Sequence, residues 1–204
     1  MALPPKNNIT LFRFDFGSFN TTSLYFFVTY YVDYNELDFL IDKLTRSIEN
    51  VVTGDSFPTE ISLINKSDLK GISTKTNWQF NWQSEFELKE REIYKLTIVN
   101  NPKVIQGLIS LEVKEDHVFM HLLENAPFNK GSSKMYVGVA ANLVAFACKV
   151  SFQRGHEGNV AFISKTQLID HYIKTLQAEL IGSRLMVIDS IAATKLIKRY
   201  FHNE

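Results

Sequence analysis

The sequence predicts an α+β fold in which a mixed, mostly antiparallel sheet is flanked by helices. Three segments with strand character follow one another between residues 93 and 123, separated only by short polar turns, which is typical of an antiparallel meander. Beyond residue 135, predicted helices and strands alternate, which places helices against the sheet. With 204 residues, 45% hydrophobic and 22% charged, the chain is long enough to bury a core of this kind.

The N-terminal part of the chain predicts a β-β-α elaboration over residues 1–54, which we expect to pack against the main domain over 55–204 because no flexible linker joins them. Aromatic residues alternate with polar ones at positions 12–16, the pattern of a half-buried strand, and a second aromatic run follows. Apolar residues spaced by three and four over positions 37–48 then predict an amphipathic helix that ends near Thr53. We interpret the aromatic residues as core, rather than as a stacking platform for bases or a groove for an acyl chain.

The main domain is predicted to begin with a strand and a helical or irregular segment that carries both tryptophans. Periodicity and turn residues then set the remaining elements. The predicted strands are Phe57–Ile64, Ile93–Val99, Val104–Lys114, His117–Leu123, Asn159–Ile163 and Arg184–Ile188, and the predicted helices are Tyr136–Phe152, Thr166–Gln177 and Ser190–Phe201.

Charge and cysteine content exclude several classes of protein. Lys plus Arg and Asp plus Glu are 22 each, so the net charge does not favour binding to nucleic acid or to an acidic membrane. The composition does not exclude a local basic groove. The single Cys148 excludes an intramolecular disulfide and a multi-cysteine zinc site, and we interpret it as a small buried hydrophobe. No run of eighteen apolar residues occurs and the N-terminus lacks a signal-peptide core, so we expect a cytoplasmic protein without a membrane partner.

The segment from residue 117 to 153 carries the most functional information. A hydrophobic strand ends in a proline-containing loop, which leads into a helix that begins around Gly138-Val139-Ala140. Helix N-termini present unpaired N–H groups and the positive end of the helix dipole, and small residues there let a phosphate approach the backbone. The same small residues also permit tight packing of the helix on a sheet, so this alternative stays open.

From Phe57 to about Ile188 the order of elements resembles that of the GNAT superfamily of N-acetyltransferases. Gly138-Val139-Ala140 looks like the second half of the family's Q/R-x-x-G-x-G/A pyrophosphate loop. The segment from 159 to 181 looks like the family's strand followed by a helix that bears a tyrosine. Met135 stands where the family has Gln or Arg, and Lys134 lies one position away.

The resemblance implies a GNAT-like fold that transfers an acyl group directly from acyl-CoA, with acetyl-CoA as the donor, to an amine acceptor. It implies that two central strands splay apart and that the pantetheine arm pairs with the exposed strand. A backbone N–H then stabilises the oxyanion. The cofactor-binding residues implied are Leu122, Leu123, Lys134, Val137, Gly138, Val139, Ala140 and Asn142.

Three residues are candidates for proton transfer. The resemblance implies that Tyr172 protonates the departing thiolate, which a phenol can do without being charged at neutral pH. Glu124 and Glu112 are candidates for the base that deprotonates the amine. A core tyrosine and solvated carboxylates at strand ends are the structural alternatives, and for the neighbouring His171 we favour a surface or packing role.

Two further interpretations stay open. His117, His121 and Glu124 look like a loose metal set, but the odd spacing from His121 to Glu124 does not suit one strand face, so we expect no metal site. The alternative function is a catalytically silent, GNAT-like binding or regulatory module for a protein or nucleic-acid partner, indicated by Met135. A homodimer is also left open.

Overall fold

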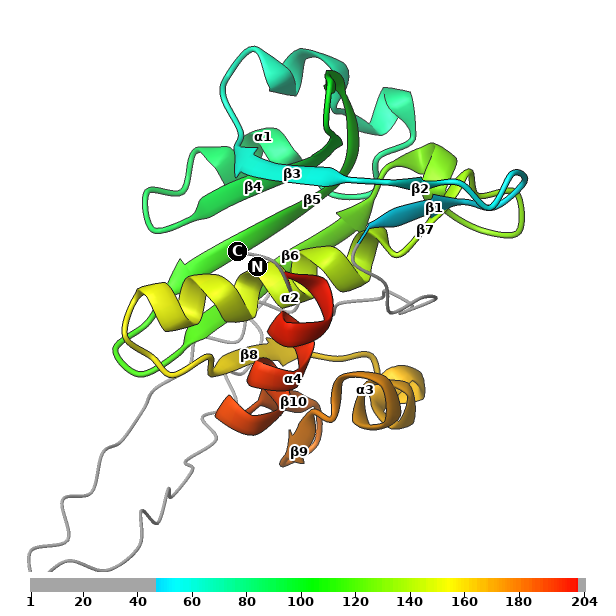
Figure 1. Cartoon of the computed structure of the whole chain (residues 1–204). Helices are drawn as coiled ribbons and strands as arrows, with labels where there is room; N and C mark the ends of the chain where they lie inside the picture. Colours follow the sequence, from blue (N-terminus) through cyan, green and yellow to red (C-terminus); the bar gives the residue numbers. More distant parts are fainter. Residues whose placement is uncertain (1–46, 202–204) are drawn as a thin grey trace, which may run out of the picture. The chain divides into compact units, whose positions relative to one another are not determined.

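The computed structural model describes residues 47–201 (Figure 1). The predicted strands and most of the predicted helix of the N-terminal elaboration lie outside the described residues, so the elaboration and its boundary at residue 54 stay predictions.

The described residues form a seven-stranded sheet with the order β3-β4-β5-β6-β8-β10-β9. Every pair of neighbours is antiparallel except β6 and β8, which run parallel. The predicted fold class, a mixed and mostly antiparallel sheet, is therefore confirmed, as is the central meander. The strands are β3 (Thr59–Leu63), β4 (Glu92–Ile98), β5 (Asn101–Val113), β6 (Val118–Asn125), β8 (Val160–Ile163), β9 (Glu179–Ile181) and β10 (Leu185–Ile188).

A second, three-stranded sheet joins β1 (Ile48–Asn50), β2 (Ser56–Phe57) and β7 (Tyr136–Val137). The prediction that a helix continues to Thr53 is wrong here. The Asn50 side chain accepts hydrogen bonds from the main-chain N–H groups of Val52 and Thr53, at 2.9 and 3.1 Å, and so closes a turn between β1 and β2. Pro58 has no N–H to donate and divides the predicted first strand into β2 and β3.

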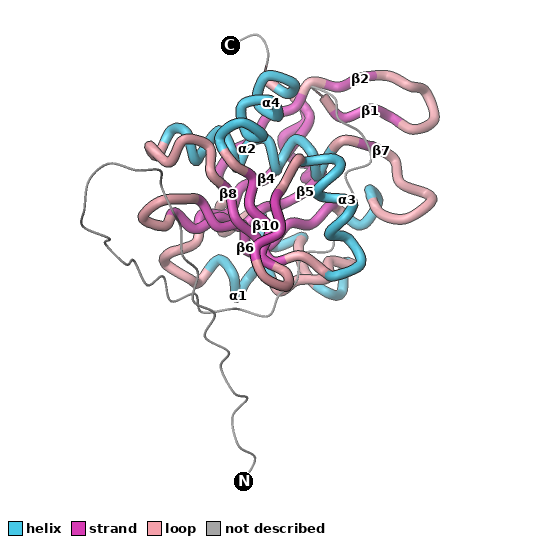
Figure 2. Tube along the Cα trace, turned by 90° about the horizontal axis from the view of Figure 1, so that it is seen from below, coloured by secondary structure: helices cyan, strands magenta, loops and turns pink. Residues whose placement is uncertain are grey.

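Helices lie on both faces of the large sheet. In Figure 2 the strands lie between α2 (Val139–Gln153) and α4 (Ser190–Tyr200) on one side and α1 (Trp82–Phe86) on the other. The 3₁₀ segments η1 (Asp68–Gly71) and η2 (Thr74–Thr76) precede α1, η3 (Pro127–Asn129) precedes β7, and η4 (Thr166–Leu168) leads into α3 (Ile169–Leu176). None of the helices within residues 47–201 is long and apolar enough to span a lipid bilayer.

Each face has its own hydrophobic core. On the α2 side, alanine and valine residues of α2 pack against strand residues such as Ile109, Met120 and Leu123. On the α1 side, Trp78 and Trp82 pack with Leu108 and Leu122. Neighbouring residues on β5 and β6 therefore serve opposite cores, as the alternation of side chains along a strand requires.

Gly107 on β5 fixes how closely α2 can approach the sheet. A Cβ atom at this position would lie 2.7 Å from Cγ1 of Val139 and 3.1 Å from the carbonyl oxygen of Glu124. Since Val139 is the first residue of α2, the close contact sets the position of the helix N-terminus. The start of α2 therefore packs closely on the sheet, as the packing alternative expects, while the anion-binding alternative stays a prediction.

We expect Gly107→Ala to lower the free energy of unfolding by about 1–3 kcal/mol, because the added methyl group overpacks the contact with α2. Chemical denaturation measures this value. Gly71→Ala is the matched control, since nothing lies within 4 Å of its Cβ position. Equal stability of the two variants would contradict the close packing described here.

Candidate active site

The central feature of the site is the separation of β6 from β8. The two strands pair only at Val118 with Val160 and at Phe119 with Ala161. Within the described residues, the rest of β6, from Met120 to Asn125, pairs with β5 alone. The sheet therefore opens between β6 and β8 at the C-terminal end of β6, as the resemblance implies.

A β-bulge in β6 lies where the two strands separate. Ser110 pairs with Leu122 and Leu111 pairs with Met120, so His121 is the additional residue between them. Such a residue interrupts the hydrogen-bonding ladder and reverses the side-chain alternation along the strand. The bulge explains why sequence spacing could not assign a face to His121, because even and odd positions exchange faces at this residue.

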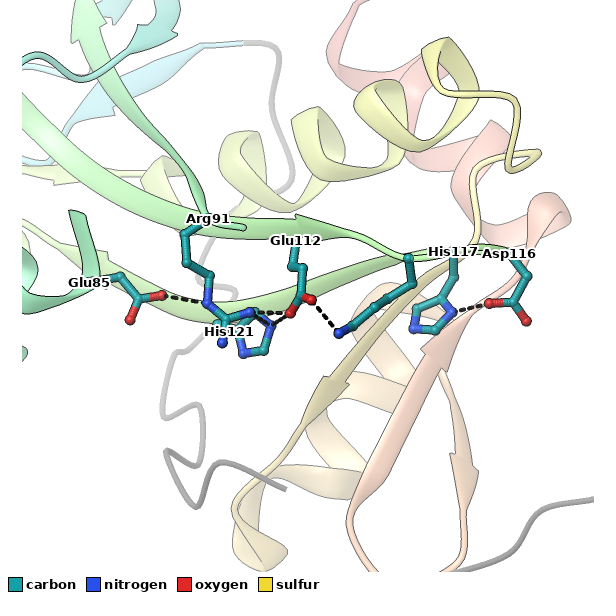
Figure 3. A network of polar contacts seen from close by, with 7 residues as sticks. Glu85, Arg91, Glu112, Asp116, His117 and His121 are labelled. Atoms are coloured by element: carbon teal, nitrogen blue, oxygen red, sulfur yellow. Dashed lines mark hydrogen bonds and ion pairs between the residues drawn. The ribbon is translucent and has the colours of Figure 1, made fainter. Parts of the chain in front are cut away.

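The bulge turns His121 toward a buried polar network on the α1 side of the sheet (Figure 3). Its Nε2 lies 2.8 Å from a carboxylate oxygen of Glu112, and Arg91 contacts both side chains. Lys114 pairs with the other oxygen of Glu112. The network continues from Arg91 to Glu85 of α1, whose carboxylate accepts a hydrogen bond from the hydroxyl of Ser110.

The charges of this network shift its pKa values. Burial and the positive charge of Arg91 lower the pKa of His121 to about 3, in spite of the neighbouring carboxylate, so the imidazole is neutral at pH 7. Burial acts to raise the pKa of Glu112, but hydrogen bonds from Lys114 and His121, together with the charge of Arg91, outweigh it and lower the pKa overall. Glu112 is thus an ionised, weakly basic carboxylate, and its role as the base stays a prediction.

We expect the pH dependence of stability to report on His121. Below about pH 6.5 the unfolded chain takes up a proton on this residue that the folded protein does not accept until about pH 3. As the pH is lowered through this window, the free energy of unfolding should therefore decrease, by at most about 1.4 kcal/mol per pH unit for this group. His121→Gln should flatten the slope between pH 7 and 5, measured by denaturation.

The control for this prediction is His156→Gln, because His156 lies in the turn after α2 and outside the network. A wild-type slope in the His121→Gln variant would contradict the neutral state of His121.

Glu124 is buried, and both of its carboxylate oxygens are engaged. One oxygen accepts from the main-chain N–H of Gln79 at 2.6 Å and contacts the Lys130 ammonium. The other accepts from the indole N–H of Trp82 at 2.7 Å and from the N–H of Phe80 at 3.3 Å. The carboxylate therefore anchors the segment that leads into α1. This use of both oxygens argues against Glu124 as the base, a role that stays a prediction.

The structure does not bring the loose metal set together. His117 pairs with Asp116 at 2.6 Å, whereas His121 pairs with Glu112, and Figure 3 shows the two histidines apart along the strands. Between residues 47 and 201, no group of three or more His, Cys, Asp or Glu side chains is arranged to hold a metal ion.

The start of α2 has the features of an anion-binding helix N-terminus. Gly138 is the N-cap and adopts φ 91°, a conformation that favours glycine. No main-chain carbonyl of the described residues accepts a hydrogen bond from the N–H groups of Val139, Ala140 or Ala141. The side chain of Asn142 donates to the Gly138 carbonyl at 2.9 Å and so holds the first turn from within.

The loop before α2 is held by residues that sequence reasoning missed. The buried Asn129 side chain donates to the main-chain and side-chain oxygens of Gln106, at 3.1 and 3.0 Å, and accepts from the N–H of Tyr136 at 3.2 Å. No sequence signal marks this pair, because the partners are far apart along the chain. Lys134 is partly buried in the loop, and Met135 is 48% exposed.

Tyr172 of α3 is completely buried. Its ring packs edge-on against Phe162 of β8, with centroids 5.3 Å apart, and its role as the acid stays a prediction. Burial lowers the pKa of His171, the next residue in α3. Cys148 is fully buried, and burial raises the pKa of its thiol to about 12. The thiol is therefore not ionised at neutral pH, which agrees with the interpretation of Cys148 as a small buried hydrophobe.

Several solved structures are similar to this chain. No protein-family model and no curated protein matches it. The ribosomal-protein-S18-alanine N-acetyltransferase of Escherichia coli matches with a TM-score of 0.46 and 13% identity, over 64% of this chain and 90% of that chain. A chimeric spermidine N-acetyltransferase, in part from Vibrio cholerae, matches with a TM-score of 0.46 and 15% identity, over 69% and 99%.

A variant of the AtaT toxin, bound to the C-terminus of the antitoxin AtaR and to acetyl-CoA, matches with a TM-score of 0.48 and 16% identity, over 68% of this chain and 97% of that chain. What this chain binds or acts on has to be argued from its own residues.

Proposed function

We propose that this protein is an acyl-CoA-dependent N-acyltransferase that uses acetyl-CoA and transfers the acyl group directly to an amine. The observation that carries the proposal is the opening between β6 and β8, combined with a glycine-capped helix N-terminus that follows β6 in the chain. A strand edge and an anion site in succession suit a ligand that has an amide-containing arm and a pyrophosphate.

The residues present fit this ligand. The N–H groups of Val139 and Ala140, with Gly138 and Val137 before them, would hold the pyrophosphate, and Lys134 would add a positive charge from the loop. The Gly138 conformation and the absence of a side chain allow close approach of an anion to the backbone. The main chain at Leu122 and Leu123 would pair with the pantetheine arm.

Acyl-CoA supplies an activated thioester. In the proposed reaction, the bond between the acyl carbon and the amine nitrogen forms while the bond between the acyl carbon and the thioester sulfur breaks. Groups of the protein would assist both changes. Beyond Phe119, the edge of β6 that faces the opening has no partner strand among the described residues, and its main-chain N–H groups would stabilise negative charge on the thioester carbonyl oxygen. Tyr172 would donate its hydroxyl proton to the sulfur that leaves, and the amine loses a proton to a base.

The alternative is a GNAT-like module without catalysis that binds a protein or nucleic-acid partner. Exposed Met135 at the position of a phosphate-contacting side chain, and carboxylates fully engaged in structural contacts, favour it. A measurement of acetyl-CoA binding distinguishes the two proposed functions.

We expect isothermal titration calorimetry to detect acetyl-CoA binding to the wild-type protein and no binding to Gly138→Glu, because the variant places bulk and negative charge at the helix start. Gly131→Glu is the matched control, since Gly131 also has a positive φ, of 68°, but lies in an open part of the preceding loop. Wild-type protein that shows no heat with millimolar acetyl-CoA would favour the binding module instead.

Tyr172→Phe should lower the turnover number with an accepted amine by about 10²–10⁴-fold, the contribution of a general acid, with little change in the affinity for acetyl-CoA. A thiol-trapping assay of CoA release measures the rate. The variant keeps the buried ring and its contact with Phe162, and circular dichroism checks that it is folded. An unchanged turnover number would assign Tyr172 to the core alone.

A further inference from the structure

The side chain of Asn125, the last residue of β6, has an unusual environment. Its Oδ1 atom is buried and has no hydrogen-bond partner. A buried acceptor without a donor costs about 1–3 kcal/mol, and most buried polar atoms in folded proteins are paired. A group that the fold leaves unpaired in this way calls for an explanation.

The strand register places this side chain beside the start of α2. Asn125 pairs with Gly107. Their neighbours Glu124 and Leu108 form the next pair and face α1, so Asn125 and Gly107 face the other side of the sheet. Because a Cβ atom on Gly107 would meet Val139 and Leu143, this face of the pair points toward the first turns of α2. Side chains of directly opposed strand residues lie about 5 Å apart, so Asn125 lies next to Val139.

The neighbouring polar side chains are paired within the protein. Asn129 and Gln106 bind each other, and Asn142 donates to the Gly138 carbonyl. On the opposite face, the carboxylate of Glu124 has four donors. The unpaired acceptor is thus specific to Asn125 among these residues, at the point where the unpaired part of β6 meets the helix N-terminus.

We propose that Oδ1 of Asn125 accepts a hydrogen bond from an amide N–H of the pantetheine arm of acyl-CoA. The proposal rests on the proposed function. A carbonyl oxygen repels an anion and needs a donor, so its partner is an N–H of the arm rather than the pyrophosphate. The pantetheine arm has two amide N–H groups that could donate. The Asn125 side chain lies between the part of β6 that does not pair with β8, where the arm would run, and the first turn of α2, where the pyrophosphate would bind.

Asn125→Leu tests the proposal, because leucine has the same number of side-chain heavy atoms, branches at Cγ as asparagine does, and removes the unpaired oxygen. The thermal unfolding midpoint of the ligand-free variant should equal or exceed that of the wild type, since a buried unsatisfied atom is lost. The affinity for acetyl-CoA should fall roughly tenfold, the effect of one hydrogen bond. The affinity for the adenosine bisphosphate fragment of CoA, which lacks the arm, should be unchanged. Asn101→Leu, at an exposed position of β5, is the matched control.

Each result decides the proposal. Absence of acetyl-CoA binding by the wild type overturns the proposed function and this inference with it. If the wild type binds and Asn125→Leu binds equally well, only the inference fails. An equal loss of affinity for the adenosine bisphosphate fragment also overturns it. Asn125→Thr keeps an oxygen and suits a strand. If neither variant folds, the side chain is required for folding and the proposal is wrong.

Discussion

The site depends on one constraint, the short parallel pairing between β6 and β8. Parallel neighbours in a sheet usually pair along most of their length, but here only two residue pairs form before the strands separate. The bulge at His121 lies two residues after the last of these pairs and is the local irregularity that accompanies the separation. The ion pairs around Glu112 hold the side chain of the bulged residue, so the opening is tied to a buried network rather than left to a flexible loop.

The small residues at the start of α2 pack on the sheet at the place where we propose the anion site. Val139 and Ala140 are buried against the sheet, and Gly107 lets the helix approach it closely. The same approach brings the first N–H groups of the helix to the end of β6. Close packing and the proposed anion site are compatible, because a helix N-terminus can face a ligand beside the strand only if the strand has no side chain in its way.

Much of the fold could be predicted from periodicity, whereas the site could be predicted only in part. The meander, α2, α3 and α4 follow from local patterns, and the start of α2 after Gly138 follows from the small residues there. The bulge could not be predicted, because the residues near His121 carry no turn signal. Three of the four partners of Glu124 come from Gln79 to Trp82, more than forty residues earlier in the chain, so these hydrogen bonds depend on the tertiary fold. The short β9 was missed, since its exposed residues show no alternation.

The end of β6 shows how the two faces of the sheet divide their roles. Glu124 points toward α1 and is satisfied by four donors, which fixes the segment before that helix. Asn125, the next residue, points toward α2 with an unpaired oxygen. Of these two adjacent residues, Glu124 therefore has all of its carboxylate oxygens hydrogen-bonded, whereas Asn125 has a side-chain oxygen without a partner. A protein leaves a buried polar atom unpaired only at a cost in stability, and here that cost falls on the α2 side of β6, where we propose that the pantetheine arm binds.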